Sequence, residues 1–445
     1  MFFHFIFIFL LLISNSTQNI FKYNLFHHSH PTEPKKPSNP IVIIPGDAGS
    51  RLRANLTGKP STVHIFCDKT TKDYFDLWLN LELFSPLIID CWADNMRLEF
   101  NVTTGMAQEL EGVHVRVPGF GNTETVEWLD ASRRSPSEYF APIVESLVSW
   151  GYTRGINVVG APYDWRRAPR ELSKYFVKLK HLIETLFYKN GNKKIVIMAH
   201  SMGNCMSNYF YYNFVNQAWK DKFLEGHISL AGAWGGSTQV IKVYASGYNM
   251  DHWRVVLPPS RLRTMQRSFT SSALLFPSPK LWGPNETFVI TPRKNYSLSN
   301  IEDFFTDIEF PQGLEQWKSE SPSLIIEPPG VKVYCIYGSE VKTPEQYIWY
   351  HNWLFPDYQP YLSEVKTPEQ YIWYHNWLFP DYQPYLSYGN GDGTVNLRSL
   401  SVCKQWDSDN NSGYQVNTTV LDGADHMGIL NDDRTIELIK NIIFK

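Results

Sequence analysis

Hydrophobic residues along the chain form short runs that alternate with amphipathic segments. Residues 41–44 (IVII) and 195–199 (IVIMA) are continuous apolar runs of the length typical of buried strands. Residues 170–189 repeat apolar side chains at a spacing near 3.6 and predict an amphipathic helix. Further strands are predicted within 227–236 (HISLAGAWGG) and 331–338 (VKVYCIYG). Strands that alternate with helices predict an α/β fold with a mainly parallel sheet covered on both faces.

The N-terminal region is interpreted as a targeting segment. Residues 1–18 hold an apolar run of about a dozen positions, whereas a membrane-spanning helix needs about 20. We interpret this run as a secretory signal peptide, followed by a linker at 19–40. Because its start carries His4 and no Lys or Arg, an uncleaved membrane anchor is the alternative.

Other features agree with the secretory pathway and predict a lysosomal or extracellular location. Six sequons are expected to be glycosylated surface positions: Asn55, Asn101, Asn285, Asn295, Asn410 and Asn417. Five cysteines permit two disulfides and one free thiol in an oxidising compartment. The chain has no Cys-x-x-Cys pair of the kind that structural zinc sites use, so no metal site is expected.

Composition adds size and charge to this picture. A chain of 445 residues, 43% of them hydrophobic, buries a large core as one elaborated domain or as two. The net charge is -3 and no long Lys/Arg block occurs, which argues against a nucleic-acid partner.

The apolar run at 195–199 leads directly into His200, Ser201, Met202 and Gly203. A strand, a serine on a sharp turn and a helix form the nucleophile elbow of α/β-hydrolases, in which the positions two before and two after the serine carry almost no side chain. Ala199 and Gly203 meet this need, although alanine stands where glycine is usual. An ordinary turn serine is the alternative, and the flanking strand and helix favour the elbow.

A nucleophilic serine needs a histidine to accept its proton and a carboxylate to orient that histidine. Downstream, Asp392 lies in a glycine-rich loop and His426 lies in a loop before the C-terminal helix, in the order that this hydrolase class uses. The alternatives are a β-turn aspartate and a surface histidine. His200 is a rival base, but a side chain next to the serine of an elbow points away from it.

Several motifs together resemble the lecithin:cholesterol acyltransferase family, most closely its lysosomal phospholipase A branch (group XV). They are VPGFGNTETVEWLD at 117–130, WGYTRGINVVGAPYDWRRAP at 150–169, AHSMGN at 199–204, QAWKDKF at 217–223, GDGTVNL at 391–397 and DHMGIL at 425–430. The resemblance implies an α/β-hydrolase with a lid and a small membrane-engaging subdomain. It implies cleavage of a glycerophospholipid acyl ester and transfer of the acyl group to water or a lipid alcohol, without metal or cofactor. Ser201 would be the nucleophile, Asp392 the orienting carboxylate and His426 the base.

The oxyanion hole is expected from the backbone N–H groups of Asp47, in the loop after the first strand, and Met202, directly after the nucleophile. The alternative for the first loop is a plain glycine turn. The family pairing implies disulfides Cys67–Cys91 and Cys335–Cys403, with Cys205 free. Ala233 stands where the family usually has proline before Trp234.

One segment departs from the family. Residues 340–363 recur without change at 364–387, where the family has a single copy. Structural repeats come in larger numbers and drift in sequence, so the alternatives are a recent duplication and an error in assembling the gene, and we favour the second. The predicted organisation is a hydrolase core start at 41–63, a membrane-engaging subdomain at 64–117, a core with the elbow at 118–236, a lid at 237–330 and a core with the Asp and His loops at 331–445.

The segment between Cys67 and Cys91 is rich in apolar side chains and is the predicted contact with a phospholipid membrane surface. Trp78 and Leu79 are expected to enter the headgroup boundary, which tryptophan favours. The alternative is that this segment packs onto the hydrolase core.

The predicted function is a serine lipid acylhydrolase and acyltransferase with a lipid alcohol as acceptor. One alternative is sterol esterification of the lecithin:cholesterol acyltransferase type. Another, of a different class, is a catalytically silent lipid carrier, against which the intact Ser201, Asp392 and His426 argue.

Overall fold

A six-stranded parallel sheet is the central element of the fold. The computed structural model describes residues 37–85, 88–133, 137–249, 258–349, 383–408 and 413–444. The strand order is β15-β12-β9-β8-β1-β7, and every neighbouring pair is parallel. The strands are β1 (Ile41–Ile44), β7 (Val158–Gly160), β8 (Ile195–His200), β9 (Leu224–Leu230), β12 (Val333–Ser339) and β15 (Val416–Asp422). The predicted α/β class is confirmed.

Some predicted features lie outside the described residues. They are the signal peptide at 1–18, the linker up to residue 36, the sequon at Asn410 and residues 350–382 of the duplicated segment. Residues Pro37–Lys445 cluster into one compact unit. Within the described ranges, no helix combines the length and the apolarity that crossing a membrane requires.

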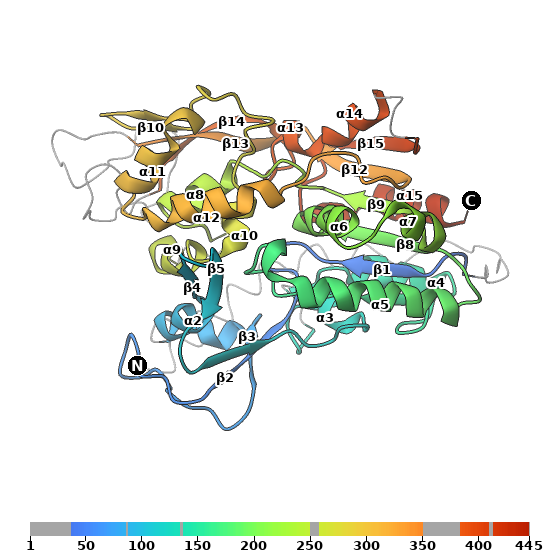
Figure 1. Cartoon of the computed structure of the whole chain (residues 1–445), viewed down its shortest axis with the longest axis horizontal. Helices are drawn as coiled ribbons and strands as arrows, with labels where there is room; N and C mark the ends of the chain where they lie inside the picture. The colour runs from blue at the N-terminus through green and yellow to red at the C-terminus, as the bar shows by residue number, and fades with distance from the viewer. Residues whose placement is uncertain are drawn as a thin grey trace, which may run out of the picture. The chain divides into compact units, whose positions relative to one another are not determined.

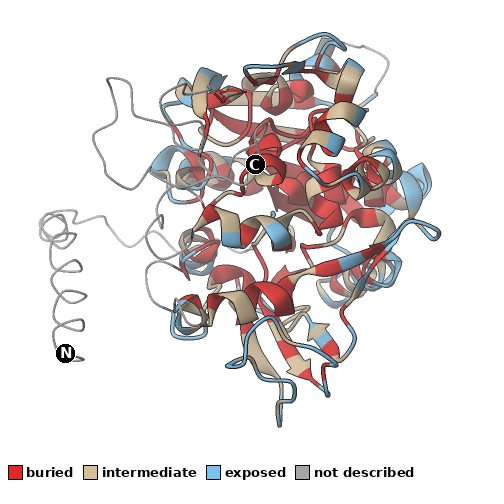
Figure 2. Cartoon of the chain, turned by 90° about the vertical axis from the view of Figure 1, so that its left-hand side faces the viewer, coloured by how far each residue is buried: buried red, intermediate tan, exposed pale blue. Residues whose placement is uncertain are grey.

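The inner strands are buried on both faces, as their continuous apolar sequences predict. All four residues of β1 and all six of β8 are buried. Figure 2 shows buried residues concentrated in the interior and exposed residues on the outer helices and loops. This layering explains why these strands show no alternation of apolar and polar positions.

Helices cover the sheet. α5 (Ser173–Lys189) and α6 (Met202–Asn213) pack against β8, α7 (Gln217–Phe223) packs against β9, and α14 (Val402–Ser408) packs against β15 (Figure 1). The helix predicted at 170–189 begins three residues later, because a 3-10 turn at Pro169–Glu171 precedes it. The other helices of the core are α3 (Glu124–Glu127), α4 (Ala141–Ser149), α13 (Leu397–Leu400) and α15 (Asp433–Ile443).

A smaller region follows β1 in the sequence. Its three-stranded antiparallel sheet has the order β3-β2-β6, and a separate hairpin pairs β4 with β5. These strands are β2 (Leu52–Leu56), β3 (Phe75–Trp78), β4 (Leu98–Asn101), β5 (Met106–Glu109) and β6 (Val113–Arg116). Helix α2 (Ile89–Met96) lies against β3 (Figure 1). The predicted subdomain at 64–117 therefore shares its sheet with β2, which precedes it.

A second apolar cluster lies in the predicted lid region. It gathers buried side chains from Val240 to Leu314 and adds Tyr347 and Trp349. The helices of this region are α8 (Gln239–Ala245), α9 (Pro259–Gln266), α10 (Thr270–Leu274), α11 (Ile301–Asp307) and α12 (Gln312–Glu320). α8, α11 and α12 contribute to the second cluster, whereas Leu262 and Met265 of α9 and Leu274 of α10 pack into the main core. A four-stranded sheet of order β11-β10-β13-β14 belongs to it, with β10 (Val289–Ile290), β11 (Asn295–Tyr296), β13 (Val341–Ile348) and β14 (Tyr385–Gly391). This cluster extends beyond residue 330, the predicted end of the lid.

Candidate active site

Ser201 occupies a sharp turn between β8 and α6. Its backbone has φ 53° and ψ -126°, a combination that residues with a side chain rarely adopt. A Cβ at Gly203 would lie 2.5 Å from the carbonyl oxygens of Ile44 and Pro45, so only glycine lets the helix approach β1 this closely. The strained serine between a strand and a helix has the geometry of a nucleophile elbow.

The structure brings Ser201, His426 and Asp392 into one hydrogen-bonded line. His426 Nε2 lies 2.9 Å from Ser201 Oγ, and His426 Nδ1 lies 2.7 Å from Asp392 Oδ2. Because an ionised carboxylate only accepts, Nδ1 carries a proton and Nε2 presents its lone pair to the serine hydroxyl. All three residues are buried, with exposed fractions of 8%, 7% and 1% for Ser201, His426 and Asp392.

Both partner loops are fixed by backbone hydrogen bonds. Asp392 Oδ1 accepts from the N–H groups of Thr394 (3.1 Å) and Val395 (2.7 Å), which leaves Oδ2 for the histidine. The N–H of His426, which follows β15, donates to the carbonyl oxygen of Asp392 over 2.8 Å. These bonds hold the carboxylate and the imidazole in one relative orientation.

The loop after β1 lies directly over the serine. A Cβ at Gly46 would lie 2.8 Å from the Cβ of Ser201, so the loop backbone is in close contact with the elbow. The N–H groups of Asp47 and Met202 have no hydrogen-bond acceptor among the described residues. Met202 is the first residue of α6, where helix N–H groups lack an internal partner.

The side chain of Asp47 has an altered acidity. The residue is accessible to solvent, yet the protein atoms that crowd its carboxyl group displace water and raise its pKa from 3.8 to about 6. A hydrogen bond from the backbone of Ala48 opposes this shift and is the smaller effect. The carboxyl group of Asp47 therefore titrates at mildly acidic pH.

Trp78 and Leu79, the predicted membrane contacts, lie inside the protein. Each is 9% exposed. The Trp78 indole N–H donates to the carbonyl oxygen of Ala48 over 2.7 Å, and its ring lies 5.4 Å from that of Trp165 and 6.2 Å from that of Trp92, measured between centroids. Their expected membrane contact does not fit this placement, because the indole finds both its acceptor and its apolar neighbours within the fold.

The cysteines are arranged as the resemblance implies. Disulfides join Cys67 to Cys91 and Cys335 to Cys403, and Cys205 is a free buried thiol. Burial raises the pKa of Cys205 to about 12, so the thiol stays protonated and unreactive. Within the described part of the chain, no group of three or more His, Cys, Asp or Glu side chains could hold a metal ion.

Five of the six sequons lie in the described ranges. Asn101, Asn285 and Asn295 are exposed, and Asn55 and Asn417 are partly buried on β2 and β15. All of them stay predicted glycosylation positions.

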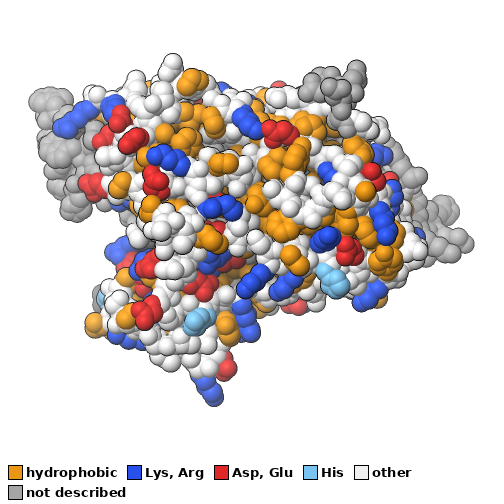
Figure 3. Space-filling model, in the orientation of Figure 1, with side chains coloured by type: hydrophobic (Ala, Val, Ile, Leu, Met, Phe, Trp, Pro, Cys, Tyr) orange, Lys and Arg blue, Asp and Glu red, His pale blue; other side chains and the backbone are white. Residues whose placement is uncertain are grey.

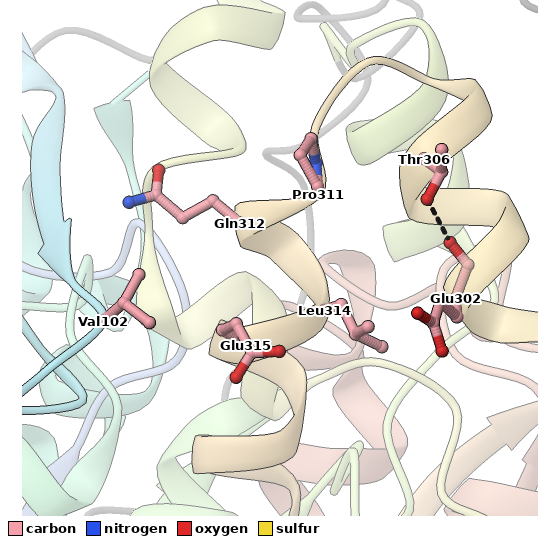
Figure 4. Close-up of a pocket in the computed structure, with 7 residues that line it drawn as sticks. All are labelled: Val102, Glu302, Thr306, Pro311, Gln312, Leu314 and Glu315. Atoms are coloured by element: carbon pink, nitrogen blue, oxygen red, sulfur yellow. Dashed lines mark hydrogen bonds between the residues drawn. The ribbon is translucent and has the colours of Figure 1, made fainter.

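A cavity of about 400 Å³ lies away from the triad. Figure 4 shows Val102, in the turn after β4, facing Gln312 and Glu315 of α12, with Glu302 and Thr306 of α11 further along. Its lining mixes apolar side chains (Val102, Pro311 and Leu314) with polar and acidic ones (Thr306, Gln312, Glu302 and Glu315). None of the predicted catalytic residues lines it.

Sequence reasoning missed Tyr139, which lies at the centre of the site. Its hydroxyl accepts from the N–H of Gly46 over 2.9 Å and lies 2.6 Å from Nδ1 of His200. No local pattern marks Tyr139, because its contacts join segments far apart in the sequence. His200 points away from Ser201, toward Tyr139 and the backbone of His426.

Comparison with known proteins gives the family. The family model described as lecithin:cholesterol acyltransferase matches residues 74–320 and 313–433. Lysosomal phospholipase A and acyltransferase from Homo sapiens is 42% identical over 406 residues, which cover 91% of this chain and 90% of that protein. Phosphatidylcholine-sterol acyltransferase from Gallus gallus is 36% identical over 433 residues, which cover 96% of this chain and 97% of that protein. The chain therefore belongs to the lecithin:cholesterol acyltransferase family.

Proposed function

We propose that this protein is a serine phospholipase A and O-acyltransferase that cleaves a fatty-acyl ester of a glycerophospholipid and passes the acyl group to water or a lipid alcohol. The observation that carries this proposal is the hydrogen-bonded line from Ser201 through His426 to Asp392. It occurs in a chain 42% identical to a lysosomal phospholipase A and acyltransferase. A protein that only carried lipid would have no use for this line.

In the first half of the reaction, Ser201 Oγ attacks the ester carbonyl carbon while His426 Nε2 accepts the hydroxyl proton. The carbonyl oxygen becomes an oxyanion, and the N–H groups of Asp47 and Met202 donate to it. His426 then returns its proton to the leaving oxygen of the lysophospholipid. The carbon–oxygen bond breaks, and the acyl group stays on Ser201 as an ester.

In the second half, a hydroxyl group replaces the departed lysophospholipid. His426 accepts its proton as the oxygen attacks the acyl-enzyme. The tetrahedral intermediate then collapses, and His426 returns the proton to Ser201 Oγ as the bond from that oxygen to the acyl carbon breaks. Water gives a free fatty acid, and a lipid alcohol gives a new ester. Asp392 stabilises the imidazolium in both halves because Oδ2 accepts its Nδ1–H.

A membrane surface supplies both lipids, and the exposed residues before Cys67 are the contact that we assign to it. Val63, Ile65 and Phe66 are 57%, 88% and 60% exposed. The disulfide to Cys91 in α2 anchors this apolar loop. Figure 3 shows one face of the molecule, on which Lys and Arg side chains are mixed with acidic and apolar ones. The assignment of this loop to the membrane therefore rests on the insertion of its apolar side chains and not on a basic surface.

The proposal is tested with purified protein, phosphatidylcholine liposomes and an added lipid alcohol. We expect both free fatty acid and an acylated alcohol in the wild type. In Ser201→Ala we expect a loss of both products by several orders of magnitude, about 10⁴-fold or more, with liposome sedimentation unchanged. Activity of Ser201→Ala within about tenfold of the wild type would reject the serine mechanism.

A further inference from the structure

A buried chain of hydrogen bonds joins the three backbone segments of the active site. The N–H of Gly46, beside Asp47, donates to the hydroxyl of Tyr139 over 2.9 Å. This hydroxyl lies 2.6 Å from Nδ1 of His200, and Nε2 of His200 lies 2.9 Å from the carbonyl oxygen of His426. Tyr139 is 3% exposed and His200 is 1% exposed. This series of buried hydrogen bonds therefore connects the loop of Asp47, past the elbow, to the backbone of His426.

The direction of each hydrogen bond follows from the chemistry of its ends. A carbonyl oxygen only accepts, so Nε2 of His200 carries a proton and donates to His426. The oxygen of Tyr139 accepts from the N–H of Gly46, and its one proton is donated to Nδ1 of His200. Burial, followed by the nearby His426, lowers the pKa of His200 well below its ordinary value, so the ring stays neutral. Each donor in the chain has one acceptor.

The two ends of this chain are the parts of the site that need accurate placement. Gly46 immediately precedes Asp47, whose N–H is assigned to the oxyanion, and a Cβ at Gly46 would lie 2.8 Å from that of Ser201. His426 is held on its other side by its own N–H, which donates to the carbonyl oxygen of Asp392. Tyr139 is held in turn by its backbone N–H, which donates to the backbone carbonyl oxygen of Glu127 over 2.8 Å.

We propose that Tyr139 and His200 are positioning residues, which hold the oxyanion-donor loop and the backbone of His426 in register with Ser201. This inference rests on the proposed function. The hydrogen bonds of Tyr139 and His200 go to each other and to the backbone of Gly46 and His426. The His200 ring also packs beside the His426 ring, with centroids 4.9 Å apart, so both side chains act by positioning. Because an oxyanion donor interacts strongly only in the transition state, a small shift of this loop lowers kcat and leaves KM nearly unchanged.

The test compares two tyrosines whose hydroxyls bind the backbone at opposite ends of β1. Tyr139 binds Gly46 after the strand, and Tyr152, 2% exposed, donates to the carbonyl oxygen of Asn39 before it over 3.0 Å. Tyr139→Phe removes a hydroxyl that makes two hydrogen bonds, and Tyr152→Phe removes one that makes a single hydrogen bond, so we expect a fall in Tm in both variants and the larger fall in Tyr139→Phe. On a water-soluble ester, we expect kcat of Tyr139→Phe to fall about 10- to 100-fold with KM within about twofold, and Tyr152→Phe to match the wild type.

A second pair of variants tests the other end of the chain. His200→Gln retains an N–H donor for the carbonyl oxygen of His426, and His200→Leu does not. We expect His200→Gln to keep a kcat at least about fivefold above that of His200→Leu, since one hydrogen bond to the catalytic segment is restored.

The outcomes separate the positioning role from the proposed function. A wild-type kcat in Tyr139→Phe, an equal fall in Tyr152→Phe, or equal kcat values in the two His200 variants would overturn the positioning role. Substantial activity in Ser201→Ala, measured alongside, would instead reject the serine mechanism. An inactive Ser201→Ala beside a fully active Tyr139→Phe would reject the positioning role alone.

Discussion

Asp47 places a titratable group beside the expected oxyanion. Its N–H is assigned to the negative charge that develops in the transition state, and its own carboxyl group has a pKa raised to about 6. When ionised, this carboxylate opposes the charge that the N–H stabilises, and when protonated it does not. If Asp47 forms the oxyanion hole as proposed, the acidity of its side chain sets the pH range in which the hole works best.

We therefore expect an acidic pH optimum that depends on Asp47. Activity should fall as pH rises through about 6, the folded-state pKa of this group. His426 must be neutral to accept the proton of Ser201, so activity also falls at low pH and the profile is bell-shaped. Asp47→Asn removes the ionisation and should retain more of its maximal kcat at pH 7 than the wild type does. Profiles of equal shape for the two proteins would contradict this explanation.

The carboxyl group of Asp47 also makes the stability of the folded protein depend on pH. The pKa of the Asp47 carboxyl group has its ordinary value of 3.8 in the unfolded chain and is about 6 in the folded protein. Between pH 3.8 and about 6, the folded state therefore retains a proton that the unfolded chain has released. The stabilising contribution of this proton is lost as pH rises through that window. The Tm of Asp47→Asn relative to the wild type should accordingly increase from pH 4 to pH 7.

Which residues meet in the site could be predicted from the sequence only in part. Ser201, Asp392 and His426 were identified because an elbow has a local signature and its partners follow in a fixed order. Tyr139 was not, because its contacts depend on how distant segments pack. The sequence could not place Trp78, which is 9% exposed, because an apolar segment near a disulfide has the same pattern whether it faces lipid or core.

At the scale of elements, β13 and β14 define how the duplicated segment fits the fold. Strand β13 comes from the first copy, and β14 begins at the end of the second copy. The two strands pair antiparallel, with Ile348 opposite Tyr385 and Val341 opposite Gly391. Asp392 follows β14 directly, so this hairpin determines the position of the Asp392 carboxylate. Ile348 and Tyr385 pair across the ladder, so the chain between them starts and ends at two strand ends that lie side by side.

Removal of one copy should leave this hairpin unchanged. Deleting residues 349–372 joins Ile348 to Trp373 and regenerates one uninterrupted 24-residue copy. Both β13 and β14 remain, so we expect an active enzyme with kcat within about twofold of the full chain, and a Tm equal or higher because loop closure costs less entropy. Melting curves and kcat on a soluble ester check this. An inactive or unfolded deletion variant would mean that both copies are required.

Strands β1, β8, β9 and β12 of the central sheet could be predicted, whereas β15 and the strands of the sheet β11-β10-β13-β14 could not. Strands β1 and β8 come from continuous apolar runs, and α5 has a clear helical period, so their patterns are strong. β10 and β11 have two residues each, too few for any periodicity. The cluster around them forms only when segments from 240 to 349 come together.

At the scale of the whole molecule, the chain that forms the oxyanion loop also leads into the region assigned to the membrane. Asp47 is followed by β2, and the exposed loop with Val63, Ile65 and Phe66 follows β2. Trp78 returns from that region and donates to Ala48, next to Asp47. The surface loop and Trp78 thus belong to one subdomain, and we propose different roles for them, membrane docking for the first and support of the loop after β1 for the second.

Substitutions at these two places should therefore separate docking from chemistry. Ile65→Ser with Phe66→Ser removes apolar area from an exposed loop, and at roughly 1.5 kcal/mol or more per side chain the loss is about 3 kcal/mol, or about a hundredfold in liposome affinity. Cleavage of a small soluble ester should be unchanged in this variant. Trp78→Ser removes the hydrogen bond to Ala48 and a buried ring, so it should lower both ester cleavage and Tm. Liposome sedimentation and soluble-ester kcat, measured on both variants, check the distinction, and liposome binding lost only in Trp78→Ser would return the membrane contact to Trp78.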